Sequence, residues 1–255
     1  MNNLAKVIAL GGRRLNRALA MHYLFSEQGI PKGYIPLAYI ESTGTQYIDL
    51  GITPSDDMEF EIEYQSLATS NTKLYGCEVN STSLFDAFGV RKTQANIRAF
   101  DGHSVNITTK AGKKNILKLV IKDGINNVYL NGELIASHQT IGRVPKSSIF
   151  LFASNKNGSA DGRGSQIIYG CRVKKTGKLV GDFRPYLNAD GEAGMYDMVG
   201  REFHGNLGTE DFVVGFENSA VSYTVTKVVQ DEKTETASVM MLMDETDTEV
   251  TDDTV

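Results

Sequence analysis

The chain has 255 residues, among them 25 Gly, five Pro, two Cys and no Trp, and its formal net charge is −5. Such a Gly-rich, Pro-poor composition with many Val, Ile, Phe and Tyr is typical of strands joined by turns. Two cysteines exclude a disulfide scaffold and a Cys-rich zinc site, and the lack of Trp disfavours a sugar-cleft enzyme.

The charge is distributed unevenly along the chain. Residues 1–33 carry a net charge of +4, residues 230–255 carry −8, and the residues between them carry −1. A nearly neutral body is a poor binder of nucleic acid, because that binding grows with the number of phosphates neutralised. No apolar run is as long as the ~18 residues of a membrane span. We therefore expect neither a nucleic-acid partner nor a membrane span.

Residues 1–33 are predicted to form a basic amphipathic helix. Apolar residues recur there at three- and four-residue spacing, and Gly29 and Pro31 follow as a stop signal. The apolar members of the stripe are Leu15, Ala18, Leu19, Tyr23 and Leu24. Because bases interrupt the apolar run, we expect no signal peptide. The helix either packs on a domain or a neighbouring chain, or docks the protein into a larger assembly.

From Tyr34 onward the apolar period changes from helical to two, which indicates short strands. Asn131-Gly132 fits a two-residue hairpin turn, and Asp123-Gly124 marks a second turn. Many short strands without an intervening helical period predict a sandwich, jelly roll or barrel. The predicted strands are 37–41, 46–50, 58–66, 74–79, 84–90, 95–100, 105–109, 116–122, 127–130, 133–138, 149–153, 166–174, 179–186, 194–198, 202–204 and 212–216.

The last residues differ in character from the body. Residues 222–229 alternate and are compatible with one final strand. Beyond them, acidic residues predominate and aromatic residues are lacking, so residues 218–255 are predicted to be an extended, disordered tail. The cluster from Met240 to Met243 is either a short partner-binding motif or a chance group of apolar residues.

Two stretches carry a resemblance to a known family. The first is Tyr39-Ile-Glu-Ser-Thr-Gly-Thr-Gln-Tyr-Ile-Asp-Leu-Gly51. The second runs through Ile167-Ile-Tyr-Gly-Cys-Arg-Val173, Gly177-Lys-Leu-Val-Gly-Asp-Phe-Arg-Pro185, Gly194-Met-Tyr-Asp-Met-Val199 and Phe203-His-Gly-Asn206. Together they resemble the concanavalin A-like, laminin-G-like jelly-roll modules of bacteriophage virion proteins and bacterial surface proteins. The likeness covers residues 34–217. In the first stretch, Gly44 suits a first strand that turns back on itself.

The resemblance implies an all-β, antiparallel jelly-roll sandwich at 34–217, preceded by the short helix. It implies adhesion or a structural virion role more often than catalysis. The expected partners are other virion or surface-assembly proteins, reached through the N-terminal helix, and host glycans, bound by a multivalent or homo-oligomeric display. The expected location is the virion, with the bacterial cell surface as the alternative.

The run Glu59-Phe60-Glu61-Ile62-Glu63 has carboxylates at alternate positions, about 7 Å apart on one strand face. Jelly-roll glycosidases use such a strand for a nucleophile and an acid/base, but Glu61 stands where their pattern has Asp. The alternative is a half-buried strand with Phe60 and Ile62 in the core. We expect no catalytic residues here.

Two polar loops at the rim of the sandwich are the candidate ligand-binding sites. Their amide and guanidinium groups can hydrogen-bond sugar hydroxyls. The loop around Asn155 also offers oxygen ligands for Ca²⁺, but it lacks the spacing of a known calcium loop, so no cofactor is expected. The candidate residues are Arg91, Gln94, Asn155, Asn157, Asp161 and Arg163.

Cys77 and Cys171 lie on predicted strands. Two buried free thiols are expected, and a bond across the sandwich is the alternative. The four histidines show no metal-ligand spacing. The leading functional interpretation is a non-catalytic glycan-binding module, followed by a purely structural virion subunit and then by a glycoside hydrolase.

Overall fold

The computed structural model describes residues 30–80, 83–100, 104–110, 112–140, 142–216, 221–228 and 234–241. Within these ranges every regular element is a strand, and no helix there is long and apolar enough to cross a membrane. Residues 1–29 of the helix predicted within 1–33 lie outside this part, and residues 30–33, which are described, are not helical. The chain divides into two compact units, Met1–Phe216 and Glu217–Val255, which are described separately.

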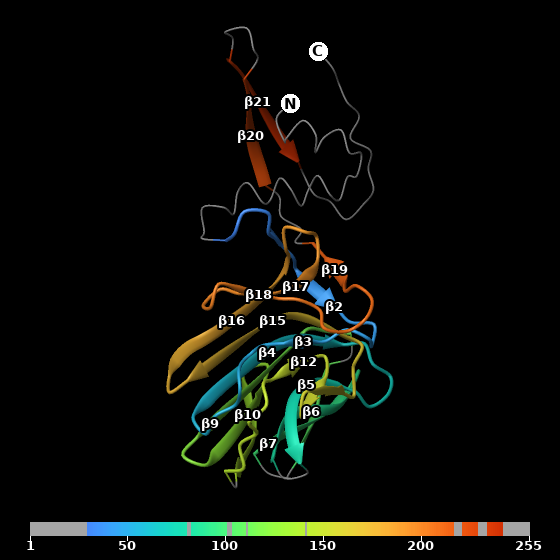
Figure 1. The fold of residues 1–255 in the computed structure, drawn as a ribbon, viewed down its shortest axis with the longest axis vertical. Helices are drawn as coiled ribbons and strands as arrows, with labels where there is room; N and C mark the ends of the chain where they lie inside the picture. The colour runs from blue at the N-terminus through green and yellow to red at the C-terminus, as the bar shows by residue number, and fades with distance from the viewer. Residues whose placement is uncertain are drawn as a thin grey trace. The chain divides into compact units, whose positions relative to one another are not determined.

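Sheet A contains 11 strands among the described residues (Figure 1). Eight of them follow the order β11-β10-β9-β4-β15-β16-β17-β18, while β1 pairs with β16, and β2 pairs with β15 and β19. Its strands are β1 (Ile35–Pro36), β2 (Tyr39–Glu41), β4 (Met58–Ser66), β9 (Asn115–Lys122), β10 (Ile125–Leu130), β11 (Glu133–Gln139), β15 (Gln166–Lys175), β16 (Lys178–Leu187), β17 (Ala193–Asp197), β18 (Glu202–His204) and β19 (Val213–Gly215).

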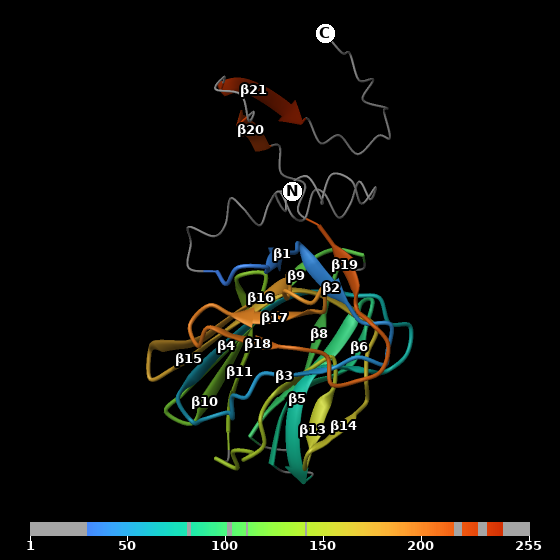
Figure 2. The ribbon, with the colours of Figure 1, turned by 45° about the horizontal axis from the view of Figure 1, so that its top comes forward.

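Sheet B contains eight strands in the described part of the chain, in the order β14-β13-β5-β6-β7-β8, with β12 between β3 and β5 (Figure 2). All its pairings are antiparallel except that of β13 with β5. Its strands are β3 (Ile48–Asp49), β5 (Lys73–Asn80), β6 (Ser83–Arg91), β7 (Gln94–Ala99), β8 (Val105–Thr108), β12 (Phe150–Leu151), β13 (Ser154–Lys156) and β14 (Ser159–Asp161).

The two sheets pack face to face around one apolar core. Along β4, every second residue from Met58 to Ser66 is buried, as a period of two requires. The ring of Phe60 in sheet A lies 4.6 Å from that of Tyr75 and 5.7 Å from that of Phe85, both in sheet B. These aromatic contacts across the interior join the sheets into a sandwich, which confirms the predicted all-β class.

The strand predictions agree with the structure over residues 37–216, except that β13 and β14 were not predicted. Each predicted segment contains an observed strand, and Met58–Ser66 and Glu202–His204 are right to the residue. The hairpin at Asn131-Gly132 is confirmed too, since Leu130 and Glu133 pair and both turn residues have positive φ, at 52° and 88°. Asparagine and glycine tolerate this left-handed conformation, which most side chains avoid.

The segment Tyr39–Gly51 does not turn back on itself, as its sequence had suggested. Instead β2 belongs to sheet A and β3 to sheet B, so the segment crosses the edge of the sandwich. Gln46 fixes the crossing. Its buried amide oxygen accepts hydrogen bonds from Ser42 Oγ and Thr43 N, both at 2.9 Å, and its amide nitrogen donates to Asp211 O at 2.8 Å.

In the second unit, β20 (Val221–Val228) and β21 (Thr234–Met241) form an antiparallel two-stranded sheet. The first strand agrees with the alternation at 222–229. The second lies within residues 218–255, which the acidic composition had predicted to be an extended, disordered tail, and corrects that prediction for Thr234–Met241. Its Thr, Ser and Val residues suit a strand, and pairing with β20 supplies backbone hydrogen bonds that a composition argument does not consider. Met240 and Met241 end this strand, and Met243 lies outside the described residues.

Candidate functional site

The outward face of sheet B carries polar side chains from four adjacent strands. On β7, Ala95, Ile97 and Ala99 lie in the core, so the residues between them lie on the opposite face. The pairing register extends this face across β5, β6 and β8. We call this surface the outer B face. It consists of Lys73, Glu78, Asp86, Phe88, Gln94, Asn96, Arg98, Asn106 and Thr108.

Asp86 is the buried centre of the outer B face. Its carboxylate accepts hydrogen bonds from Lys73 Nζ at 2.6 Å and Arg98 Nε at 2.7 Å, and also from Arg98 Nη2. The side chain has no exposed surface. Asp86 pairs with Arg98 on one side and with Gly76 on the other, where a Cβ would lie 2.5 Å from that of Asp86. The glycine therefore leaves room for the carboxylate and its two bases.

The ion cluster extends along β5 and holds Arg98 against an aromatic ring. Glu78 lies 3.7 Å from Lys73 Nζ, 3.9 Å from Arg98 Nη2 and 3.2 Å from Lys156 Nζ. The guanidinium carbon of Arg98 lies 4.0 Å from the ring centroid of Phe88. A guanidinium bound to a carboxylate and stacked on a ring loses little further freedom when it binds a ligand.

Neutral hydrogen-bonding groups lie beside this cluster. Asn96 pairs with Asn106, and Gln94 pairs with Thr108, across β7 and β8. Gln94, Asn106 and Thr108 are exposed and Asn96 is half-buried. Side-chain amides donate and accept at once, which matches the hydroxyl groups of a sugar. The outer B face therefore combines a fixed cation with adjustable neutral partners.

Two of the residues that the sequence singled out lie at the border of this face. Arg91 ends β6 and pairs with Gln94 at the start of β7, with Lys92 and Thr93 as the turn between them. Both side chains are exposed. The structure thus places Arg91 and Gln94 opposite each other.

The predicted loop around Asn155 is a β-hairpin rather than a long turn. β13 and β14 pair, and Asn157-Gly158 forms their two-residue turn with φ values of 51° and 92°. Asn155 is buried, and its amide nitrogen donates to Ser148 O at 3.0 Å while its oxygen accepts from Gly158 N at 2.7 Å. Its polar atoms therefore hold the hairpin together.

Asp161 and Arg163 at the end of this hairpin are exposed. The guanidinium of Arg163 lies 5.4 Å from the ring centroid of Tyr47. Asn157 donates to Val79 O at the C-terminal end of β5, whereas Arg91 follows Phe88, which pairs with Lys73 at the other end of β5. The Asn157 turn and the Arg91 turn thus lie at opposite ends of sheet B and do not form one site.

The carboxylates of β4 lie on the outward face of sheet A, opposite the buried Phe60 and Ile62. Glu59 lies 3.0 Å from Lys118 Nζ and 3.3 Å from Lys174 Nζ. The hydrogen bond from Lys118 holds the pKa of Glu59 below its ordinary value. A general acid requires the opposite shift, so this carboxyl group is poorly suited to be the acid of a glycoside hydrolase.

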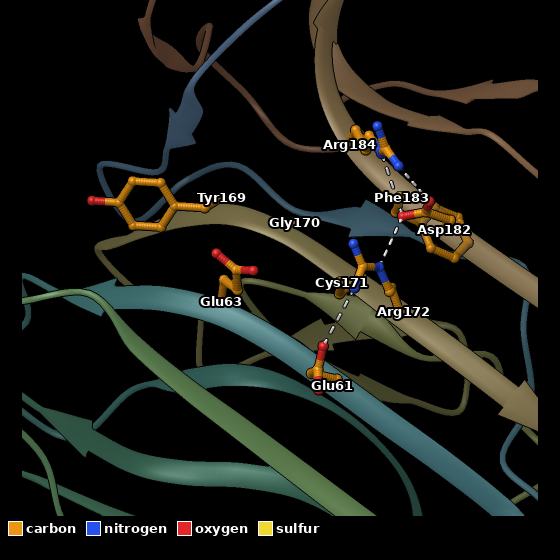
Figure 3. A pocket seen from close by; sticks show the side chains of 9 residues that line it. All are labelled: Glu61, Glu63, Tyr169, Gly170, Cys171, Arg172, Asp182, Phe183 and Arg184. Atoms are coloured by element: carbon orange, nitrogen blue, oxygen red, sulfur yellow. Dashed lines mark hydrogen bonds and ion pairs between the residues drawn. The ribbon is translucent and has the colours of Figure 1, made fainter. Parts of the chain in front are cut away.

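A hollow of about 120 Å³ lies beside these carboxylates, on β4, β15 and β16 (Figure 3). Arg172 bridges its walls, with Nη1 3.8 Å from Glu61 and Nε 3.5 Å from Asp182, and Arg184 Nη2 lies 2.9 Å from Asp182. At the other end, Glu63 accepts from Lys114 Nζ at 2.7 Å. Ligand pockets usually span ~300–1,000 Å³, so this hollow is too small for an oligosaccharide.

Neither cysteine forms a disulfide, and burial raises the pKa of the thiols of both Cys77 and Cys171. The expectation of two buried free thiols is confirmed. Of the two histidines in the described part of the chain, His204 has Nδ1 2.8 Å from Asp49 O, and His138 has Nε2 3.4 Å from Asn126 Nδ2. No group of three or more His, Cys, Asp or Glu within the described ranges is placed to hold a metal ion. The expectation that no cofactor binds near Asn155, with Ca²⁺ as the alternative, stays a prediction.

No protein-family model and no curated protein matches the chain. Among solved structures, a candidate carbohydrate-binding protein of Bacteroides ovatus is similar, with a TM-score of 0.53 and 13% identity over 72% of this chain and 61% of that one. The carbohydrate-binding module CBM40 of the Ruminococcus gnavus IT-sialidase gives a TM-score of 0.36 at 18% identity, over 56% of this chain and 89% of the module. A heptameric pentraxin of Limulus polyphemus gives 0.40 at 11% identity, over 55% and 74%.

This chain therefore spans about three fifths of the length of the Bacteroides ovatus protein. At 13% identity, that likeness establishes a shared fold and no shared ligand. It agrees with the predicted sandwich, because the likeness extends over 72% of this chain.

Proposed function

We propose that the protein is a non-catalytic module that binds host glycans through the outer B face. The observation that carries this proposal is the row of amides at Asn96 and Asn106 beside the fixed guanidinium of Arg98. Protein–sugar contacts need donors and acceptors for hydroxyl groups, and rigid planar groups provide them at a low cost in conformational entropy. The name of the Bacteroides ovatus structure supports a glycan as the ligand.

The proposed setting is a phage virion, as a tail, fibre or capsid-decorating protein, with a bacterial surface as the alternative. The resemblance of Tyr39–Gly51 to virion modules supports it, as does the basic segment 1–33, which is proposed to attach the module to other assembly proteins. Shallow polar sites bind sugars weakly, so adhesion would depend on many copies acting together.

The test is a glycan array probed with the full chain coupled in many copies to beads. The double variant Asn96→Ala/Asn106→Ala is expected to lose at least tenfold in binding and to keep the melting temperature of the wild type, because both side chains lie on the outward face. Asn127→Ala, on the outward face of sheet A, is the matched control and should bind normally. If beads bind no glycan while virions that carry the protein still attach to cells, the protein is a purely structural subunit.

A glycoside hydrolase would require one protonated carboxyl group in the β4 row, and the bases around Glu59 oppose this. Incubation with a panel of β-glucans and bacterial polysaccharides is expected to release no reducing ends. Turnover that disappears in Glu59→Gln or Glu63→Gln would show instead that the protein is a glycoside hydrolase.

A further inference from the structure

Five exposed bases gather at one end of the sandwich, where the β6–β7 turn meets the connection from β8 to β9. Arg91 and Lys92 belong to the turn, and Lys110, Lys113 and Lys114 belong to the connection. We call these five residues the basic rim. All of them are exposed, so their charges face solvent rather than the core.

Hydrogen bonds hold the two parts of the basic rim together. Thr109 N donates to Thr93 O at 2.9 Å, and Thr109 Oγ1 donates to Lys92 O at 3.2 Å. The buried amide of Asn115 then fixes the connection, since Nδ2 donates to Lys113 O at 2.9 Å and Oδ1 accepts from Lys110 N at 3.2 Å. The backbone that presents the five bases is therefore set by buried groups.

The positive charge of the basic rim is largely uncompensated. The sequence has no Asp or Glu at 67–72, 91–98 or 104–118, the segments that form and border the rim. Within the described residues, Glu63 is the one acid recorded in an ion pair with a rim base, 2.7 Å from Lys114 Nζ. The acids of the adjoining outer B face, Asp86 and Glu78, are buried or nearly so and are paired with bases. Surface groups of one sign concentrate ligands of the opposite sign.

The rim is continuous with the proposed glycan-binding surface. Arg91 pairs with Gln94, and Gln94 pairs with Thr108, so one row of residues borders both the rim and the amides of the outer B face. A chain molecule lying along this row would meet hydroxyl-binding amides on one side and ammonium groups on the other. Sugar hydroxyls and carboxylates or sulfates together fit that arrangement.

We infer that the basic rim makes the protein selective for acidic polysaccharides, whose carboxylate or sulfate groups pair with Lys92, Lys110 and Lys113. The inference rests on the proposed glycan-binding function and names its ligand class. A nucleic acid fits less well, because the whole chain carries a net charge of −5. The ring of Tyr169 beside the rim is already covered by the ammonium group of Lys114, 4.8 Å from its centroid, and is less available to stack on a base.

The test compares acidic polysaccharides with their own uncharged derivatives. The full chain on beads is offered alginate, polygalacturonate and hyaluronan, each beside a carboxyl-reduced form that keeps the backbone and loses the charge. We expect at least one acidic form to bind tenfold or more tightly than its reduced form. Raising NaCl from 50 to 500 mM should remove most of that advantage, because salt screens exposed charges.

The variant Lys92→Gln/Lys110→Gln/Lys113→Gln is expected to lose the preference for the charged form while retaining its melting temperature. The matched control is Lys122→Gln/Lys175→Gln/Lys178→Gln, which changes the net charge equally at the opposite end of sheet A, where Met58 pairs with Ile121 and Lys175. The control should bind like the wild type.

Three results would overturn the inference, and they differ in whether they also refute the proposed glycan-binding function. Equal binding of charged and reduced forms would refute the selectivity and leave the glycan-binding function standing. Failure of every polysaccharide, charged or reduced, would refute both. Tighter binding of single-stranded oligonucleotides than of any polysaccharide would reassign the basic rim to nucleic acid.

Discussion

Asp86 shows how a single buried charge organises the candidate site. Lys73 and Arg98 both hydrogen-bond to it, and its side chain has no exposed surface. Replacing it by Ala would leave two cations facing each other with 12% and 18% of their side chains exposed. We expect Asp86→Ala to lower the free energy of unfolding by about 3 kcal/mol, as for other broken buried ion pairs.

Urea denaturation followed by circular dichroism measures this loss. Asp161→Ala is the control, since Asp161 is exposed and should cost less than about 0.5 kcal/mol. Equal effects of the two substitutions would contradict the role assigned to the buried network.

Glu41 offers a test through pH. Burial raises the pKa of this carboxyl group, so the folded state binds its proton more tightly than the unfolded state does. Its ionisation therefore costs stability as the pH rises through the raised value, and that cost persists at neutral pH. We expect Glu41→Gln to stabilise the protein modestly at pH 7 and to lose this advantage at acidic pH, below the ordinary pKa of a glutamate. Denaturation curves at both pH values measure it, and a gain that is independent of pH would contradict the assigned cause.

For single residues, the sequence predicts which face of a strand a side chain occupies better than it predicts which side chains it contacts. The alternation of Glu59 to Glu63 placed Phe60 and Ile62 in the core, and the structure confirms it. Nothing in a single strand shows that Asp86 lies between Lys73 and Arg98, because the register of three strands brings them together. Register depends on the packing of the whole sheet, so the outer B face emerged only from the fold.

Among the elements of the first unit, the hairpin of β13 and β14 was predicted wrongly, as was the course of Tyr39–Gly51. The strands of the hairpin have three residues each and few apolar side chains, so the sequence shows no alternation of apolar and polar residues there. The turn signal was present, however, because Asn157-Gly158 repeats the Asn-Gly pair that was interpreted correctly at Asn131. A two-residue Asn-Gly turn thus predicts a hairpin even between polar strands.

This turn supplies a prediction at the same scale. Gly158 has a φ of 92°, a conformation that costs an L-residue with a Cβ about 1–2 kcal/mol. We expect Gly158→Ala to lower the free energy of unfolding by about 1 kcal/mol, measured by urea denaturation. Thr93→Ala, in a turn whose residues have no positive φ, is the control and should change stability by less than half as much. A neutral Gly158→Ala would mean that the hairpin adopts another turn.

For the whole molecule, the N-terminal boundary of the sandwich lies before Tyr34, the residue at which the apolar period of the sequence changes from helical to two. Ile30 is buried against Tyr186 and Tyr196, and the ring of Tyr34 lies 5.3 Å from that of Tyr196. The apolar core residues of the sandwich extend to Phe212. A protein spanning residues 30–216 therefore includes every buried apolar group described for the first unit, whereas one starting at residue 34 lacks Ile30.

We expect the protein of residues 30–216 to melt at the temperature of the full chain. The protein of residues 34–216 should be less stable by about 1.5 kcal/mol, the lower end of the range for burying an aliphatic side chain. Differential scanning calorimetry and urea denaturation of the three proteins measure both differences, and Ile30→Ala in residues 30–216 separates the side chain from the truncation. If residues 30–216 melt many degrees below the full chain, residues 217–255 contribute to the stability of the sandwich. If residues 34–216 are as stable as residues 30–216, the cluster around Tyr196 does not depend on Ile30, and the fold begins where the sequence period changes.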